Sequence, residues 1–164
     1  MTDFTMHAPE KRDAAEIYAM LQPYKPYVGT SPLYTYLLVC EHFSETSIVV
    51  KTKEGEIVGF ISAYWPPKKS NTIFLWEIAV KEGYHGNNLY IRMVNEIYQR
   101  NTPLYIEATV NPSNISSIKR LVQLSKTFKC TYTTQTLFPS DYFGSQGHED
   151  EVLYRIGVIE KDGV

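Results

Sequence analysis

The spacing of apolar residues along the chain predicts a mixture of strands and helices. Runs rich in β-branched and aromatic residues predict strands at 3–7, 72–80, 104–110, 129–137 and 151–159, with two more within 46–65. The two strands within 46–65 are expected to form a hairpin at Glu54-Gly55. Apolar residues at helical spacing predict helices at 9–21, 31–43 and 88–100, and another after Asn114. This order predicts one mixed α/β domain over residues 1–164.

Prolines and a serine predict where the first two helices begin. Pro9 is expected to open the first helix, because the missing N–H of proline costs nothing in the first turn. Ser31 is expected to cap the second helix, with Pro32 at its first helical position. Residues 138–150 are expected to form a long loop between the last two strands, and such loops are often functional lids.

Composition excludes several classes of protein. The 164 residues are 43% hydrophobic and 21% charged, as in a soluble globular chain. The net charge of -2 leaves no basic surface for nucleic acid. No apolar run is long enough for a membrane span, and the first residues lack a signal-peptide core, so a cytoplasmic protein is expected. Cys40 and Cys130 are expected to be buried, reduced and non-catalytic.

The segment KEGYHGNNLYIRMV, residues 81–94, is the first candidate for chemistry. It joins a predicted strand to a predicted helix through two separated glycines and two asparagines. A glycine-rich turn at a helix start directs free backbone N–H groups at an anion. An ordinary strand-to-helix loop is the alternative that these residues alone leave open.

The order of elements around this turn resembles the core of the GNAT acetyltransferases. The resemblance rests on the strand at 72–80, the turn, the helix at 88–100, the strand at 104–110 and the helix after Asn114. It implies a mostly antiparallel sheet with a central parallel strand pair and flanking helices. It also implies that the backbone of the turn holds the pyrophosphate of acetyl-CoA, the expected acyl donor. The cofactor-binding residues that follow are Ile78, Val80, Tyr84, His85, Gly86, Asn87, Asn88, Leu89 and Asn114.

A narrower resemblance lies in four blocks: residues 37–50, 56–67, 105–114 and 137–157. They are similar to the diaminobutyrate acetyltransferases of ectoine biosynthesis, and the last block is the most specific because it lies outside the general GNAT core. The resemblance implies transfer of an acetyl group to the γ-amine of L-2,4-diaminobutyrate. It also implies a cytoplasmic homodimer.

The chain departs from these families in the turn, near Gly29 and at Leu121. The usual turn begins with Arg or Gln and ends with Gly or Ala, whereas Gly83 and Asn88 stand here, so acyl-CoA binding would rest on backbone N–H groups and His85. An acid is expected near Gly29 to bind a substrate amine. Leu121 stands where many GNAT enzymes carry the tyrosine that protonates the leaving thiolate, so water or His148 would have to serve.

Two glutamates are candidates for the base that takes a proton from the substrate amine. Glu77 lies on the strand expected to meet the cofactor, and acids at the equivalent place in polyamine acetyltransferases face the amine. Glu107 lies on the neighbouring strand, where some GNAT enzymes carry a glutamate base. Either could instead be structural: Glu77 on an outer strand face, Glu107 as a buried, hydrogen-bonded acid.

Substrate binding is expected from aromatic residues and from the loop before the last strand. Tyr34 and Tyr36 point to different faces of one helix, and the resemblance favours Tyr34 for the pocket. Trp76 is a candidate pocket wall or a core residue. The run GHEDE offers His148 and Asp150, with Glu149 weaker, although a solvated loop is the plain alternative. One histidine beside adjacent carboxylates lacks metal-ligand spacing, so no metal is expected.

The resemblance implies an acetyl-CoA-dependent diaminobutyrate N-acetyltransferase. Direct attack in a ternary complex is expected, since no cysteine has the setting of a nucleophile. The first alternative is a GNAT acetyltransferase for another diamine or amino acid, favoured by Gly29. The second is a catalytically silent acyl-CoA-binding module, favoured by the altered turn.

Overall fold

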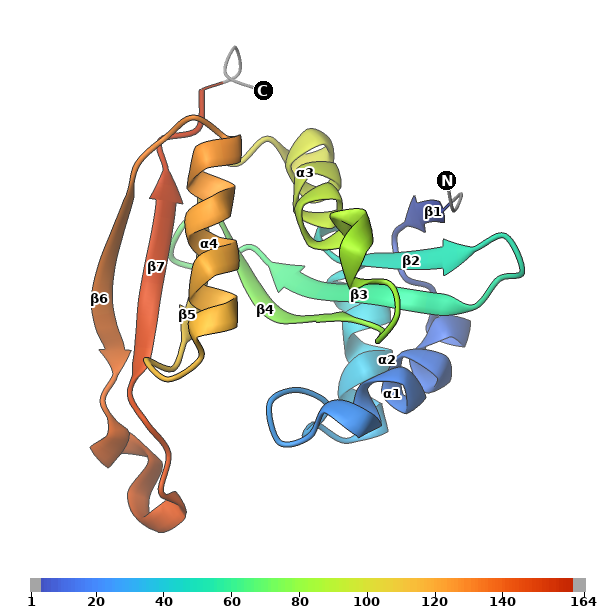
Figure 1. Cartoon of the computed structure of the whole chain (residues 1–164), viewed down its shortest axis with the longest axis horizontal. Coiled ribbons are helices and arrows are strands. Elements are labelled where there is room, and N and C mark those ends of the chain that lie inside the picture. Colours follow the sequence, from blue (N-terminus) through green and yellow to red (C-terminus); the bar gives the residue numbers. More distant parts are fainter. Residues whose placement is uncertain (1–3, 161–164) are drawn as a thin grey trace. The chain divides into compact units, whose positions relative to one another are not determined.

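The computed structural model describes residues 4–160, apart from the side chain of Asn87. Asp3, in the first predicted strand, and the ends of the predicted domain lie outside these residues. The sheet has seven strands in the order β1-β2-β3-β4-β5-β7-β6 (Figure 1). In chain order they are β1 (Phe4–His7), β2 (Ile48–Thr52), β3 (Ile57–Tyr64), β4 (Thr72–Val80), β5 (Tyr105–Val110), β6 (Tyr132–Phe138) and β7 (Glu151–Gly157).

Strand direction agrees with the predicted fold class. The pairs β1–β2, β2–β3, β5–β7 and β6–β7 are antiparallel. β4 and β5 run parallel, with Thr72 opposite Tyr105 and Phe74 opposite Glu107. The predicted mixed α/β fold with a parallel pair at its centre is confirmed. No helix within residues 4–160 is long and apolar enough to cross a membrane.

The described chain forms two compact units. The first unit contains residues 4–64 and 75–102, and the second contains 65–74 and 103–160. The helices of the first unit are α1 (Ala14–Leu21), α2 (Leu33–His42) and α3 (Leu89–Asn101), with 3-10 turns η1 (Lys11–Asp13), η2 (Gln22–Tyr24), η3 (Ser44–Thr46) and η4 (His85–Asn87).

The first unit has helices on both faces of its strands (Figure 1). Val49, Phe60 and Ala79 pack with buried residues of α1 and α2, including Ile17 and Tyr36. On the other face, β2 and β3 lie close under α3. A Cβ built on Gly59 would lie 3.0 Å from a methyl group of Val50 and 3.2 Å from the sulfur of Met93. Glycine at this position therefore allows α3 to approach the sheet closely.

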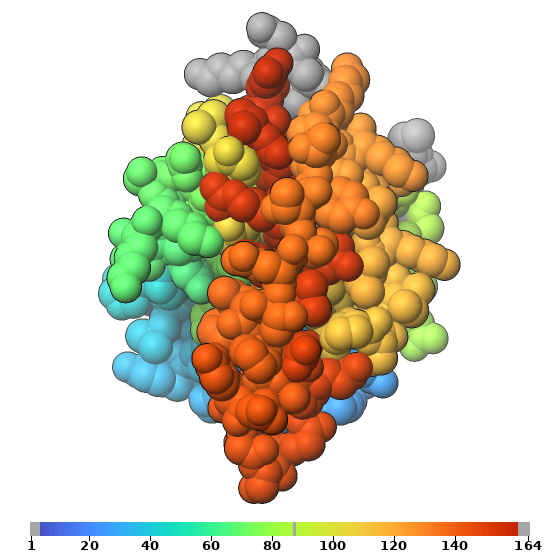
Figure 2. All heavy atoms as spheres, turned by 90° about the vertical axis from the view of Figure 1, so that its left-hand side faces the viewer, coloured from blue at the N-terminus to red at the C-terminus, as the bar shows by residue number. Residues whose placement is uncertain are grey.

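The second unit contains β5, β6 and β7 with α4 (Ile115–Thr127) and the 3-10 segment η5 (Ser140–Gln146). Leu121 and Leu124 of α4 are buried, as are Ile106 of β5 and Ile156 of β7. β6 is the last strand of the sheet and almost every residue in it is exposed. Figure 2 shows β6 and η5, in orange, on the surface of this unit.

The starts of the first two helices differ from the prediction. Pro9 does not open α1, because the backbone turns first through η1, where the Asp13 carboxylate accepts the Glu10 N–H at 2.9 Å. α2 starts at Leu33, since Pro32 has an extended backbone with ψ 159°. Ser31 does not cap this helix, and its side chain hydrogen-bonds the Tyr36 hydroxyl instead. The expected loop at 138–150 contains η5.

Candidate active site

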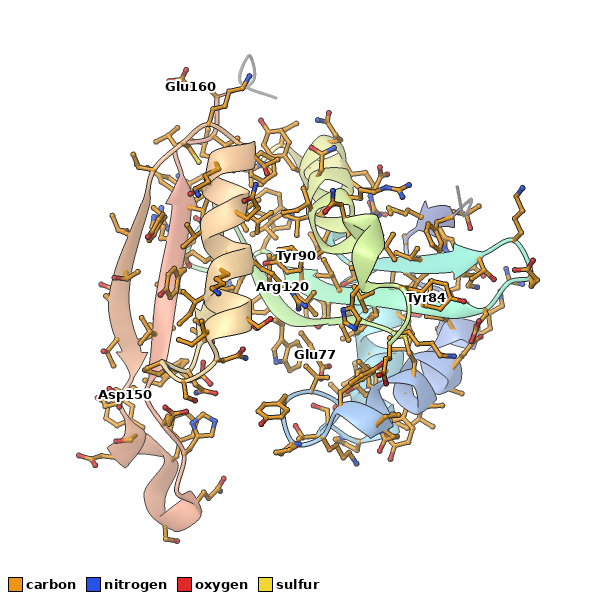
Figure 3. The ribbon with its side chains drawn as sticks, in the orientation of Figure 1. Glu77, Tyr84, Tyr90, Arg120, Asp150 and Glu160 are labelled. Atoms are coloured by element: carbon orange, nitrogen blue, oxygen red, sulfur yellow. The ribbon has the colours of Figure 1, made fainter. Side chains whose placement is uncertain are left out.

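The carboxylate of Glu77 is held at both oxygens within the first unit. Its Oε1 accepts the backbone N–H of Gly29 at 2.6 Å, and its Oε2 accepts the hydroxyl of Tyr36 at 3.0 Å. Figure 3 shows the Glu77 side chain extending from β4 toward the loop that joins α1 and α2. Glu77 is half-buried, so it is neither a solvated surface acid nor a core residue.

The two tyrosines of α2 lie on different faces, as their spacing predicted. Tyr34 is 67% exposed, whereas Tyr36 is 1% exposed. Burial raises the pKa of Tyr36 well above its usual range, and the negative charge of Glu77 adds to this effect. Tyr36 therefore remains a proton donor to Glu77. The sequence favoured Tyr34 for the pocket and gave no signal for the contact between Tyr36 and Glu77, which are 41 positions apart.

Gly29, where an acid was expected nearby, has a backbone that only glycine adopts easily. Its φ is +73°, and a Cβ would lie 2.6 Å from the carbonyl oxygen of Leu21. The carboxylate beside Gly29 is that of Glu77 itself. A substrate amine near this loop would therefore meet the charge of Glu77.

Trp76 precedes Glu77 on β4 and is 50% exposed. Its ring makes an edge-on contact with Tyr64, with centroids 6.3 Å apart. Tyr64 in turn lies against Phe43, at 5.8 Å. An exposed tryptophan supported by two further rings fits a pocket wall better than a core residue.

The turn after β4 is fixed where it leaves the strand. The N–H of Lys81 donates to the carbonyl of Val58 at 2.8 Å, and the N–H of Glu82 donates to the hydroxyl of Tyr24 at 2.7 Å. The ammonium group of Lys81 is bonded to the carboxylate of Glu56. Figure 3 shows Tyr84 in this turn. These contacts hold the start of the turn in place.

The later part of the turn has room for a ligand against its backbone. η4 is followed by Asn88, whose left-handed φ of 53° turns the chain into α3 at Leu89. A Cβ built on Gly86 would meet no atom within 4 Å. The first N–H groups of a helix have no acceptor within the helix, and they carry the positive end of its dipole. The geometry therefore suits an anion such as a diphosphate.

The cofactor residues expected on β4 also lie in the first unit. Val80 is 8% exposed and Ile78 is half-buried. His85 begins η4 and is exposed. The side chain of Asn87 is outside the described part of the structure, so its predicted role in cofactor binding stays a prediction.

Glu107 lies in an ion cluster of the second unit. Its side chain is 2% exposed, and its oxygens lie 2.9 and 2.8 Å from the ammonium nitrogen of Lys69. The guanidinium of Arg155 also donates to Glu107 and stacks on the Tyr105 ring, 3.6 Å from its centroid. Two cations therefore neutralise this carboxylate, which fits the structural alternative better than a base. Lys69 and Arg155 are 38 and 48 positions away in sequence, so no local pattern signalled this cluster.

Asn114 caps α4 in the second unit. Its side-chain oxygen accepts the N–H of Ser117 at 3.2 Å, which occupies that oxygen and leaves its amide N–H groups for a ligand. Leu121 is 3% exposed in the core of α4 and carries no proton to donate.

The loop at 138–150 is closed by its own polar residues. Asp150 accepts the N–H of Ser140 at 2.7 Å, which ties the two ends of the loop together at the place labelled in Figure 3. His148 stacks on the ring of Phe143, with centroids 3.9 Å apart. Its Nδ1 lies 2.7 Å from the carbonyl of Glu149. His148 is thus held in one orientation, and Asp150 has a structural partner.

The end of this loop is attached to the turn before α4. The side-chain amide of Asn111 donates to the carboxylate of Glu151 at 3.0 Å and to the carbonyl of Asp150 at 3.2 Å. The hydroxyl of Ser113 donates to Glu149. Asn111 and Ser113 were not predicted as site residues, although they lie in the same NPSN segment as Asn114.

The cysteines have no setting for catalysis. Burial raises the pKa of Cys40 to about 11 and also raises the pKa of Cys130, so both are thiols near neutral pH. Cys40 lines a groove of about 780 Å³ with residues such as His7 and Lys51, and none of the predicted site residues lines it. Among the described residues, no group of three or more His, Cys, Asp or Glu side chains could hold a metal ion.

Comparison with known proteins agrees with this arrangement of strand, open turn and helix. Residues 14–121 match the acetyltransferase (GNAT) family. The chain belongs to this family. The match includes Glu77, the turn at 81–88, Asn114 and Leu121, so each of these positions lies within the GNAT region.

Individual members of the GNAT family show which of its enzymes this chain is similar to. The chain is 39% identical to the L-2,4-diaminobutyric acid acetyltransferase of Virgibacillus pantothenticus, over 93% of this chain and 97% of that protein. It is 33% identical to the protein of that name from Marinococcus halophilus, over 93% and 89%. The crystallised diaminobutyrate acetyltransferase of Paenibacillus lautus, in complex with L-2,4-diaminobutyric acid and coenzyme A, superposes with a TM-score of 0.89 at 26% identity and covers 99% of both chains.

Proposed function

We propose that this GNAT protein transfers the acetyl group of acetyl-CoA to the γ-amine of L-2,4-diaminobutyrate, a reaction of ectoine biosynthesis. The observation that carries the proposal is the similarity to diaminobutyrate acetyltransferases over nearly the whole chain. That similarity extends beyond the GNAT match at 14–121 and takes in the loop at 138–150.

Deprotonation of the amine is the first chemical requirement. An aliphatic amine with a pKa of about 10 is about 99.9% protonated at pH 7. Forming the neutral, nucleophilic amine therefore costs about 4 kcal/mol, which adds to the activation barrier. Glu77 is the proposed base, directly or through one water. A carboxylate can accept about four hydrogen bonds, and Gly29 and Tyr36 provide two, so acceptor positions remain.

The acetyl group then passes directly between the two substrates. The amine nitrogen attacks the thioester carbonyl carbon and forms the C–N bond. The tetrahedral intermediate collapses with cleavage of the C–S bond, the nitrogen loses its second proton, and the thiolate of coenzyme A takes a proton from water or from His148. The raised pKa values of Cys40 and Cys130 support this route over an acyl-enzyme.

Cofactor binding is proposed at the turn of the first unit. The backbone of residues 84–89 would hold the pyrophosphate, because the open side of Gly86 and the start of α3 favour a diphosphate. The N–H of Tyr84 already donates to the Lys81 carbonyl at 3.1 Å, so the donors would come from the residues after it. Ile78 and Val80 of β4 would contact the rest of the cofactor within the first unit. Asn114 of the second unit is proposed as a cofactor contact from the family resemblance alone.

Substrate binding is proposed for Tyr34 and Trp76 of the first unit and, separately, for His148 and Asp150 of the second unit. The diamino acid carries two ammonium groups and a carboxylate, so it needs acidic and hydrogen-bond-donating partners. Of the two loop residues, His148 is the better supported. It stacks on Phe143, yet its side chain is 37% exposed, and its Nε2 lies 3.7 Å from Glu151. The single hydrogen bond of Asp150 to Ser140 leaves its second oxygen for the substrate.

A cytoplasmic homodimer is proposed from the same family resemblance. The outer face of α2 supports a protein contact, because Leu33, Leu37 and Leu38 are each more than a third exposed. Light scattering coupled to gel filtration would give twice the chain mass for the dimer, and a monomeric mass would contradict it.

The test is acetyl-CoA cleavage followed as free thiol, with a panel of amines. The panel contains L-2,4-diaminobutyrate, ornithine, lysine, spermidine and an amine-free control. We expect the highest kcat/KM for diaminobutyrate and an Nγ-acetyl product by NMR. A higher value for another amine would support the alternative favoured by Gly29. Binding of acetyl-CoA without thiol release for any amine would indicate a silent module.

A further inference from the structure

The two groups that hold Glu77 are themselves unable to move far. Gly29 combines a φ of +73° with a position where even a methyl group would collide with the Leu21 carbonyl. Its N–H is therefore fixed in direction by a backbone conformation that few other residues could adopt. The hydrogen bond from this N–H to Glu77 is 2.6 Å long, which is short for an N–H donor, and hydrogen bonds to an ionised acceptor are the shorter ones.

Tyr36 is fixed by packing against two aromatic rings. Tyr18 of α1 lies 6.1 Å away and Phe60 of β3 lies 6.0 Å away, measured between ring centroids. With 1% of its surface exposed, the ring has no space for another rotamer. Ser31 hydrogen-bonds the Tyr36 hydroxyl and so orients its proton toward Glu77.

We propose that Tyr36 and the Gly29 N–H are positioning groups that hold the Glu77 carboxylate in its reactive orientation. The proposal rests on the role of Glu77 as base in the proposed function. Donors to the charged form of a carboxylate favour that form, and two donors on different oxygens also fix the plane of the group. The remaining acceptor positions then point in a direction set by the protein rather than by side-chain rotation.

Other titratable groups of the first unit around this site are few. Tyr18 lies beside Tyr36, and Lys25, in the loop between α1 and α2, lies 6.0 Å above the Tyr18 ring. Glu77 itself is bonded to the backbone of that loop and to α2. Tyr36 is therefore the titratable side chain in direct contact with Glu77 among the contacts that the structure describes.

A purely structural tie is the competing explanation. Glu77 could simply close the loop between α1 and α2, as many strand carboxylates do. Loss of such a tie would lower the melting temperature and change KM through disorder of the loop. It would not move the pH dependence of the reaction.

The experiment compares Tyr36→Phe with Tyr18→Phe. Both remove one hydroxyl from the same aromatic cluster, but only Tyr36 donates to Glu77. We expect Tyr36→Phe to lower kcat at least about fivefold and to move the acid limb of the kcat/KM profile upward by about one pH unit, the size expected for one lost hydrogen bond to a charged group. Tyr18→Phe should leave both unchanged.

A second measurement does not require turnover. In 13C-glutamate-labelled protein, with the Glu77 resonance assigned through Glu77→Gln, the titration midpoint of that resonance should rise in Tyr36→Phe and not in Tyr18→Phe. Unchanged midpoints and an unchanged acid limb in a folded Tyr36→Phe protein would overturn the proposal. If the wild-type protein acetylates no amine, the proposed function fails, whereas the NMR titration still decides the positioning of Glu77.

Discussion

The ammonium nitrogen of Lys69 lies 2.9 and 2.8 Å from the two carboxylate oxygens of Glu107. Glu107 is 2% exposed, and Arg155 donates to it from β7. Arg155 also approaches Thr72 at 3.3 Å, so the cluster joins β7 and β5 to the first residue of β4 within the second unit. Removal of the carboxylate would leave two cations facing each other around a buried gap.

Glu107→Gln is therefore expected to destabilise the protein. Breaking a buried ion pair commonly costs a few kcal/mol, and the partial exposure of Lys69 and Arg155 reduces this to about 2 kcal/mol. Urea denaturation followed by circular dichroism would measure the free energy of unfolding. The Lys69→Met/Glu107→Gln pair should recover part of the loss, because it removes one of the two unbalanced cations.

Glu77→Gln is expected to have the opposite profile, with a small loss of stability and a large loss of rate. Glutamine keeps the size of the side chain. Its oxygen can still accept the Gly29 N–H, and its NH2 group can donate to the Tyr36 oxygen, but it lacks the charge and basicity. We expect kcat to fall severalfold or more and the rising limb of the pH–rate profile to shift. Wild-type kcat and pH profile in Glu77→Gln, together with a folded but inactive Glu107→Gln, would assign the base to Glu107.

Much of the fold could be predicted from the sequence. The strands and helices were expected in the observed order, because apolar periodicity reports which face of each element is buried, and the GNAT and diaminobutyrate acetyltransferase resemblances are confirmed. Helix starts were predicted less well. Local capping rules predicted a hydrogen bond from Ser31 to the first turn of α2. In the structure Ser31 hydrogen-bonds the side chain of Tyr36 instead.

The partners of the candidate site residues could not be predicted, because they come from distant segments. Nothing in the sequence around Glu77 indicates Gly29, 48 positions away. Gly29 looked like the loss of an expected acid, and in the structure it is a backbone donor to Glu77. Similarly, Asp150 was predicted as a substrate-binding acid of the loop, and no local pattern indicated that it accepts the N–H of Ser140 at the start of η5. The roles of these residues in catalysis and binding stay predictions.

Gly86→Val is expected to weaken acetyl-CoA binding about tenfold or more without unfolding the protein. A Cβ at this position would meet no protein atom within 4 Å, so the main effect of the substitution is expected on a ligand held against the backbone. Loss of one hydrogen bond to a charged group accounts for a factor of this size. Isothermal titration calorimetry would measure the affinity, with Gly86→Ala as the smaller control. Wild-type affinity in Gly86→Val would place the pyrophosphate elsewhere.

His148→Ala is expected to raise KM for diaminobutyrate far more than KM for acetyl-CoA. His148 is held against Phe143 at the end of a loop that is hydrogen-bonded to Asn111 and Ser113. The substitution would therefore remove an ordered side chain that is proposed to bind the substrate. Tyr142→Ala is the matched control, because Tyr142 lies in the same loop and is 76% exposed. Steady-state kinetics with each substrate varied in turn would separate the two effects. Equal changes in both KM values would assign the loop another role.

The pair between Asp13 and Lys51 predicts an acid-dependent loss of stability. Asp13 is 3% exposed, and its Oδ1 lies 2.6 Å from the Lys51 ammonium nitrogen. Burial alone would raise the pKa of Asp13, but the Glu10 N–H and the charge of Lys51 outweigh it, so this pKa is lowered. A lowered pKa in the folded state means that the unfolded chain binds the proton more tightly. The stabilisation is therefore complete above the unfolded pKa of about 3.9 and is lost as the pH falls through the folded pKa.

Asp13→Asn should accordingly lower the free energy of unfolding by about 2 kcal/mol at pH 7, the scale of a hydrogen bond to a charged group. The difference from the wild-type protein should stay constant between about pH 5 and 8 and shrink below about pH 4, where Asp13 becomes protonated. Glu41→Gln is the control, since the Glu41 and Lys11 side chains of its ion pair are 49% and 70% exposed and should contribute little. Urea denaturation at a series of pH values would measure both variants. A difference for Asp13→Asn that persisted unchanged to pH 2 would show that packing, rather than the carboxylate charge, accounts for the contribution of Asp13.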